Sequence, residues 1–258
     1  MKNSLLCLCA LLLAGCASGP WVDRSLSAQS QDSRVRYIVI HYTALDLARS
    51  VHELTQEAVS SHYLLTDGPA PKILGLVDES QRAYHAGASS WKGVTQLNAS
   101  SVGIEIVNPG YRDTPSGPVW DEFQSNQIDL LIPLLKDIAK RHGITPERVL
   151  AHSDIAPQRK EDPGPLFPWK RLADAGLVQW PDASAVARYQ PRYEAQLPDL
   201  GWFQRRLMKH GFAVPQSGEL DAATRRVLAA FQMKYRPSRY DGLPDAQTAA
   251  LLAALTEP

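Results

Sequence analysis

Two histidines and one aspartate stand at positions from which a folded chain could bring them to a single point. His41 and His152 each end a stretch of β-branched and aliphatic residues, and Asp162 follows in a loop rich in proline and glycine. Catalytic zinc sites hold the ion through three ligands of these types and leave a fourth position for water. Each histidine could also be an ordinary hydrogen-bonded group at a strand end, so spacing alone leaves both interpretations open.

Two more ionisable residues could serve the same site. Glu105 lies in the otherwise apolar segment 102–107, where a buried carboxylate is costly unless it is paired or faces a cleft. Burial would raise its pKa and suit a general base, whereas an edge strand would turn it toward water. Lys160 precedes Asp162 by two residues, so it could reach the same cleft or remain a solvated loop lysine.

The surrounding pattern predicts a sheet flanked by helices. Apolar stretches that alternate with helical spacing indicate an α/β domain around one sheet, and consecutive short strands without a long crossover indicate a mixed sheet. A small three-helix domain follows, with Asp221 and Asp245 as N-caps. The predicted strands span residues 35–41, 62–65, 73–77, 102–107 and 148–151, and the predicted helices of the first domain follow residue 41 and cover 123–138.

The first residues have the features of an export signal, so we do not expect them to be part of the folded domain. Lys2 precedes an apolar stretch, 5–13, that is too short to span a bilayer. The sequence ending at Cys16 is similar to a bacterial lipobox, in which this cysteine is lipidated; an ordinary signal peptide or a buried helix is the alternative. Because Ala17 follows, the resemblance favours the periplasmic face of the outer membrane, to which the lipid would anchor the protein.

Composition narrows the choice of partners and of donor atoms. The chain has 27 basic and 27 acidic residues, so nothing in its charge favours a nucleic-acid partner. Cys7 and Cys9 would leave with the signal and Cys16 would be acylated, which leaves histidine and carboxylate side chains as metal ligands. No His-Glu-x-x-His sequence occurs, which argues against the common metallopeptidase design. The expected organisation is a signal peptide at 1–16, a catalytic domain at 17–182, a linker at 183–198 and a helical domain at 199–258.

Several segments resemble the zinc-dependent N-acetylmuramoyl-L-alanine amidases, which share a fold with animal peptidoglycan recognition proteins. The most specific is 152–165, with the sequence HSDIAPQRKEDPGP. The others are 38–43 (IVIHYT), 59–63 (VSSHY), 84–87 (YHAG, where the family has WHAG) and 98–108 (NASSVGIEIVN). Together with the C-terminal motifs described below, the resemblance extends over nearly the whole mature chain.

This resemblance implies hydrolysis of the amide bond between N-acetylmuramic acid and L-alanine in peptidoglycan or in muropeptides. It implies one zinc ion per chain, with His41, His152 and Asp162 as ligands, Glu105 as general base and Lys160 as the stabiliser of the transition state. His85 is a candidate for the lining of the substrate cleft, with a packing role as the alternative. The competing hypothesis is a lipoprotein that binds peptidoglycan without cutting it. The presence of both Asp162 and Glu105 favours the enzyme.

The C-terminal region resembles a second family, the helical peptidoglycan-binding domain. The matching motifs lie at 203–207, 230–232 and 241–248, and one departure is Ser217-Gly218-Glu219 where the family has Asp-Gly. Such domains are non-catalytic and bring enzymes to the cell wall. The resemblance therefore implies peptidoglycan as a partner of this domain, and it leaves the oligomeric state open.

Overall fold

The computed structural model describes residues 20 and 22–257 and divides into two compact units, residues 1–32 and 33–258. The expected signal peptide and Cys16 lie outside the described residues, so the lipid anchor stays a prediction. The described part of the first unit contains no helix or strand. Across the described residues, no helix combines the length and the apolar character that crossing a membrane requires.

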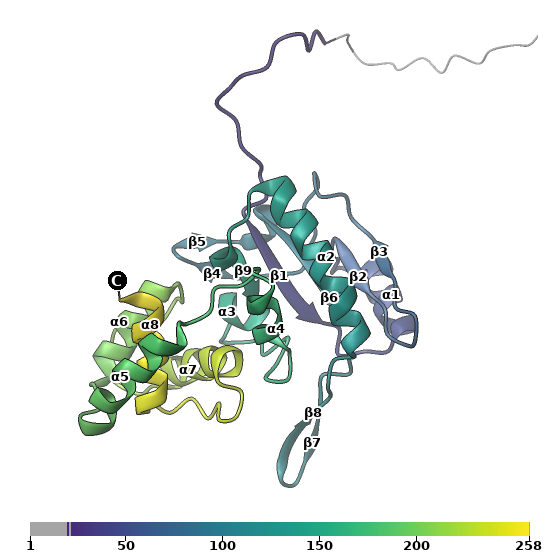
Figure 1. The fold of residues 1–258 in the computed structure, drawn as a ribbon. Coiled ribbons are helices and arrows are strands. Elements are labelled where there is room, and N and C mark those ends of the chain that lie inside the picture. Colours follow the sequence, from purple (N-terminus) through teal and green to yellow (C-terminus); the bar gives the residue numbers. More distant parts are fainter. Residues whose placement is uncertain (1–19, 21, 258) are drawn as a thin grey trace, which may run out of the picture. The chain divides into compact units, whose positions relative to one another are not determined.

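A five-stranded sheet forms the centre of the second unit (Figure 1). Its strands lie in the order β3, β2, β6, β1, β9, and all neighbours run parallel except β2 and β3. The expected α/β class and mixed sheet are therefore confirmed. The strands are β1 (Tyr37–Tyr42), β2 (Tyr63–Leu65), β3 (Ile73–Gly75), β6 (Ser101–Ile106) and β9 (Val149–Ala151).

One face of this sheet is covered by helix α2 (Ser125–His142), which lies over the strands in Figure 1. Side chains alternate between the two faces of a strand, so Ile38 and Ile40 share a face with Ile104 of the neighbouring strand. These residues form a buried core with the apolar stripe of α2. The helix ends at Gly143, whose φ of 65° is the left-handed conformation that a C-terminal glycine cap adopts.

The opposite face carries the residues that the sequence singled out. Val39 and His41 point to this face from β1, and Glu105 points to it from β6 as the register partner of His41. Helix α1 (Leu47–Gln56) packs Leu54 over the part of this face nearest β2, in a small apolar cluster. The parallel pairing of two interior strands therefore places an imidazole and a carboxylate side by side.

The C-terminal region contains four helices, one more than the sequence predicted. The expected linker, 183–198, holds helix α5 (Ala183–Ala195), which begins at the N-cap Asp182 and buries Tyr193. Pro191 and the many polar residues weaken its apolar pattern, but contact with α8 stabilises the helix. The remaining helices are α6 (Leu200–His210), α7 (Ala222–Tyr235) and α8 (Ala246–Thr256), of which the last two are capped by Asp221 and Asp245 as predicted.

A single hydrophobic core joins these helices to the sheet. Val39 and Leu150 of the sheet belong to the same buried cluster as Phe231 of α7. The ring of Trp91 packs edge-on against Phe212, at 5.1 Å between ring centroids. The catalytic and helical parts predicted from the sequence therefore share this buried cluster within the second unit.

Short strands and helices connect the main elements. Two hairpins, β4–β5 and β7–β8, form two-stranded sheets separate from the main sheet, and helix α3 follows β9 directly. The short elements are β4 (Ser90–Trp91), β5 (Val94–Thr95), β7 (Tyr111–Thr114), β8 (Gly117–Trp120), α3 (His152–Ile155), α4 (Trp169–Asp174), η1 (Leu97–Ala99) and η2 (Pro146–Arg148).

Candidate active site

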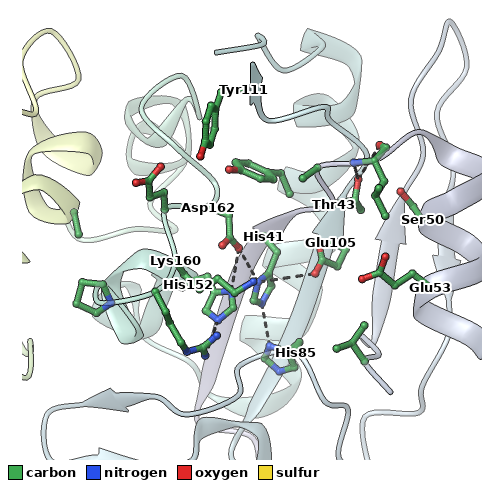
Figure 2. A pocket seen from close by; sticks show the side chains of 18 of the residues that line it. His41, Thr43, Ser50, Glu53, His85, Glu105, Tyr111, His152, Lys160 and Asp162 are labelled. Carbon is green, nitrogen blue, oxygen red and sulfur yellow. Dashed lines mark hydrogen bonds and ion pairs between the residues drawn. The ribbon is translucent and has the colours of Figure 1, made fainter. Parts of the chain in front are cut away.

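The three ligand candidates meet at one point although the chain separates them widely (Figure 2). The Nδ1 atom of His41 lies 3.0 Å from Nδ1 of His152 and 3.0 Å from Oδ2 of Asp162. The third side of this triangle, from His152 Nδ1 to Asp162 Oδ2, measures 3.1 Å. His41 comes from the end of β1, His152 from the first position of α3, and Asp162 from the loop beyond it. The structure thus brings the predicted residues together.

The hydrogen bonds around His41 determine which of its nitrogens carries the proton. Ser101 donates its hydroxyl proton to the Leu97 carbonyl at 2.6 Å, so its oxygen must accept from Nε2 of His85 at 3.1 Å. The Nδ1 atom of a neutral His85 is then unprotonated and accepts from Nε2 of His41 at 3.0 Å. This leaves Nδ1 of His41 with a free lone pair that points into the triangle.

The contacts of His152 place its Nδ1 atom in the same triangle. Its Nε2 atom lies 3.2 Å from the carbonyl oxygen of Ala86, an acceptor, and 3.3 Å from Nη2 of Arg159, a donor, so these two contacts favour opposite tautomers. The lone pair of His41 Nδ1, the Nδ1 atom of His152 and the Asp162 carboxylate therefore converge. Three donor atoms within 3.1 Å of one another are the arrangement that a bound cation requires. Tetrahedral ligands about 2.0–2.1 Å from zinc stand about 3.3 Å apart, close to the distances seen here, so the residues fit a zinc ion.

The pKa values of His41 and Asp162 agree with a role of these side chains as metal ligands. Burial, and then the neighbouring His152, lower the pKa of His41 to about 4, so its imidazole is neutral near pH 7. Burial acts to raise the pKa of Asp162, but contacts with His152 and His41 outweigh it and hold that pKa well below its usual value. A neutral imidazole beside a charged carboxylate is the state in which these groups bind a metal.

Gly103 creates the space that His85 needs. This glycine lies on β6 between Ser101 and Glu105, on the face that carries the cluster. A Cβ atom at Gly103 would stand 2.5 Å from Cδ2 of His85, a distance that real Cβ atoms essentially never show. His85 is only 8% exposed, so its ring could not move aside easily. His85 lines the cleft, as expected, and it also orients a ligand candidate from behind.

Glu105 lies on an interior strand of the sheet, and not on an edge strand that would turn its side chain toward water. Strand β6 lies between β1 and β2, and Oε1 of Glu105 is 4.0 Å from Nδ1 of His41. Its Oε2 atom is buried and has no hydrogen-bond partner among the described residues. Burial, followed by the charge of Asp162, raises the pKa of Glu105 well above its ordinary value. A free carboxylate oxygen with a raised pKa beside the cluster is what a general base requires.

A cleft of about 540 Å³ opens over the cluster and Glu105. Lys160 lines it, and its side chain makes no hydrogen bond or ion pair within the described part of the chain. The neighbouring Arg159 is engaged elsewhere, because its guanidinium donates to the carbonyl oxygens of Ala86 and Ala88. Lys160 is therefore the cation of this loop that remains available to a ligand.

Two parts of the cleft wall were not predicted from the sequence. Tyr111, on the β7–β8 hairpin, stands over the site with 40% of its surface exposed (Figure 2). Its only local signal was the turn sequence 114–117, Thr-Pro-Ser-Gly, which could have indicated a hairpin. Arg226, on α7, also lines the cleft, and no sequence signal linked it to residues so far away in the chain.

Comparison with known proteins gives two matches within the chain and several over nearly its full length. Residues 31–165 match the family described as N-acetylmuramoyl-L-alanine amidase, and residues 196–252 match the family described as putative peptidoglycan binding domain. The chain is 44% identical over 262 residues to N-acetylmuramoyl-L-alanine amidase AmiD of Escherichia coli K12, covering 96% of this chain and 95% of that protein.

Solved structures are similar over the same extent. The E. coli AmiD complex with the substrate anhydro-N-acetylmuramic acid-L-Ala-D-γ-Glu-L-Lys has a TM-score of 0.82 at 42% identity, covering 92% of this chain and 94% of that one. AmpDh3 of Pseudomonas aeruginosa in complex with anhydromuramic pentapeptide has a TM-score of 0.85 at 40% identity, covering 92% of this chain and 98% of that one.

Proposed function

We propose that this chain, which belongs to the N-acetylmuramoyl-L-alanine amidase family, hydrolyses the bond between N-acetylmuramic acid and L-alanine with a zinc ion held by three side chains. Its class as a peptidoglycan amidase follows from the family. The zinc dependence is supported by one observation: the Nδ1 atoms of two imidazoles and one carboxylate oxygen lie within 3.1 Å of one another, close to the spacing of ligands around one zinc ion. The side chains concerned are His41, His152 and Asp162.

Glu105 has the role of proton carrier in this proposal. A zinc ion in the site would supply Lewis-acid polarisation and make water acidic enough to lose a proton near neutral pH. The unpaired Oε2 of Glu105 accepts the proton of the attacking water. Glu105 then passes that proton to the nitrogen of L-alanine as the amide bond breaks, so the products are a lactyl carboxylate and a free amine. The carboxylate ends the cycle in its starting state.

Lys160 and His85 support this proton transfer in different ways. The ammonium group of Lys160 lies in the cleft without a partner in the described residues and offers positive charge to the carbonyl oxygen as negative charge develops there. His85 contacts no substrate in this scheme. Its hydrogen bond from His41 keeps the His41 lone pair directed at the cluster, so we assign it a positioning role.

Substrate class and location complete the proposal. The relatives' complexes hold anhydromuramyl peptides, and we propose muropeptides and peptidoglycan as the substrates of this chain. Residues 196–252 would hold it to the cell wall, in agreement with their match to a peptidoglycan-binding domain. Lipidation of Cys16 would anchor it to the periplasmic face of the outer membrane, which a Cys16→Ser variant tests: this variant should leave the membrane fraction, and its retention there would refute the anchor.

The role of the cluster can be tested with variants of matched chemistry. We expect His41→Ala to lose both bound zinc and activity, and Glu105→Gln to keep zinc while turnover falls about 10²- to 10⁴-fold. His52→Ala is the control, since His52 is exposed on α1 and lines no part of the cleft. Zinc is counted by atomic absorption and turnover by the release of peptide. Full activity after exhaustive chelation, or in Glu105→Gln, would refute the assignment.

The bond that is cut can be identified from the products. Mass spectrometry of a peptidoglycan digest should reveal free stem peptides that begin with L-alanine. Shortened peptides still attached to the sugar would instead indicate a peptidase. Binding to the wall without any product would indicate the non-catalytic alternative.

A further inference from the structure

Helix α7 of the C-terminal region forms part of the wall of the amidase cleft. Four of its residues line the cleft: Arg226, Ala229, Ala230 and Met233. Their spacing of three, one and three residues places them on one face of the helix. The cleft over the cluster therefore contains residues from both of the regions that match separate families.

The structure also fixes this helix in place. The ammonium group of Lys234 lies 2.6 Å from Oδ2 of Asp154 in α3, and the two side chains are 4% and 1% exposed. At the other end of the helix, Nε2 of Gln158 donates to the carbonyl oxygen of Ala223 at 3.1 Å. A helix held at both ends, against α3 and against the loop that follows it, presents its cleft face at a defined position.

Arg226 is the one charged residue on that face, and it has no carboxylate to pair with among the described residues. Its side chain is exposed and makes no hydrogen bond or ion pair within the part of the chain that the structure describes. The neighbouring Arg225 has a partner, since its Nε donates to the carbonyl oxygen of Asp241 at 3.0 Å. The other cleft-lining residues of α7 are alanine and methionine, which leave the guanidinium free to meet a ligand.

We propose that Arg226 binds a carboxylate of the stem peptide, so that the wall-binding region is part of the substrate site. This inference rests on the proposed function. A peptide linked through the γ-carboxyl of glutamate keeps its α-carboxylate free, and its last residue keeps a terminal carboxylate, so two groups of the same chemistry are available. A guanidinium offers a planar pair of donors that matches a carboxylate.

The interaction acts on binding and leaves the proton transfer at Glu105 untouched. A contact that is equally strong in the bound substrate and in the transition state lowers KM without raising kcat. For a partly exposed pair of this kind we expect Arg226→Gln to raise KM about tenfold and to change kcat by less than threefold. Raised salt should weaken binding to the intact protein more than binding to the variant.

The test compares three soluble muropeptides: the free acid, the α-amide at the γ-linked glutamate, and the C-terminal amide. We expect the intact protein to lose about tenfold in kcat/KM on one of the two amides, which identifies the carboxylate that Arg226 binds. Arg226→Gln should lose about tenfold on the free acid and show no further loss on that amide. Arg225→Gln is the matched control and should behave as the intact protein.

Two results would overturn the inference. One is an unchanged KM for Arg226→Gln on the free acid. The other is an amide penalty that is as large in Arg226→Gln as in the intact protein, because the carboxylate would then be bound elsewhere. If the intact protein cleaves none of the three peptides, the proposed function itself fails, and this outcome is distinct from the other two.

Discussion

Replacing Lys234 should destabilise the whole second unit, although this residue belongs to the region that matches a wall-binding domain. Its ammonium group is 2.6 Å from Asp154 Oδ2, lies 4.3 Å from the centre of the Trp169 ring, and is 3.4 Å from the carbonyl oxygen of Val149. In Lys234→Met the carboxylate of Asp154 would remain buried without its counter-charge. Asp154 also accepts the backbone N–H of Ala151, which fixes the start of α3.

The size of this effect follows from the burial of the pair. Removing one partner of a buried ion pair costs about 3–5 kcal/mol, because the other charge is left uncompensated. For a unit of this size each kcal/mol corresponds to about 2–4 °C in Tm, so we expect Lys234→Met to lower Tm by about 10 °C. Thermal unfolding followed by circular dichroism measures the shift. Because α3 begins with His152, turnover at a temperature where the variant is still folded should also fall.

Two further variants decide whether the buried charge is the cause. Lys234→Met combined with Asp154→Asn should recover most of the loss, since an asparagine oxygen can still accept from Ala151 while the isolated charge is gone. Lys209→Met, on the exposed side of α6, should stay within about 0.5 kcal/mol of the intact protein. The reasoning is refuted if Lys234→Met shifts Tm by less than about 2 °C, or if the double variant is no more stable than the single one.

Three other predictions follow from the same structure. Gly103→Ala should reduce activity at least tenfold, because the new Cβ atom displaces His85. Adding His85→Ala should restore the stability of this variant but not its activity, with stability measured by thermal unfolding and activity by peptide release. A fully active Gly103→Ala variant would contradict the close packing of Gly103 against His85. Burial, followed by the charge of Lys234, lowers the pKa of His210 from 6.5 to about 3. The unfolded chain therefore binds a proton at His210 before the folded protein does, so the free energy of unfolding falls by about 1.4 kcal/mol per pH unit below about pH 6.5. The urea midpoint of His210→Gln should fall less steeply between pH 6.5 and 4 than that of the intact protein, and an equally steep fall in the variant would contradict this assignment. A chain that ends at residue 198 should lose activity on small muropeptides as well as on whole sacculi, because the truncation removes Lys234 and a cleft wall; unchanged cleavage of small muropeptides would contradict this.

The sequence by itself determined the strands of the main sheet, helix α2 and the donor types. Apolar stretches with β-branched residues located β1, β2, β3, β6 and β9, and the helical spacing with a terminal glycine located α2 and its end. These features are local, since strand and helix periodicity depend on residues within a few positions of one another. The expected mature chain has no free cysteine, and this alone limited the ligand candidates to histidine and carboxylate side chains.

The arrangement of those elements was decided only in three dimensions. Whether Glu105 faces water or the cluster depends on β6 lying between β1 and β2, and strand order is not written in any single strand. Helix α5, which lies within the expected linker, was not predicted, because its apolar pattern is weak and the helix depends on its contact with α8. Arg226 and Lys234 could not be connected to the site from the sequence, because long-range packing of α7 against α3 brings them there.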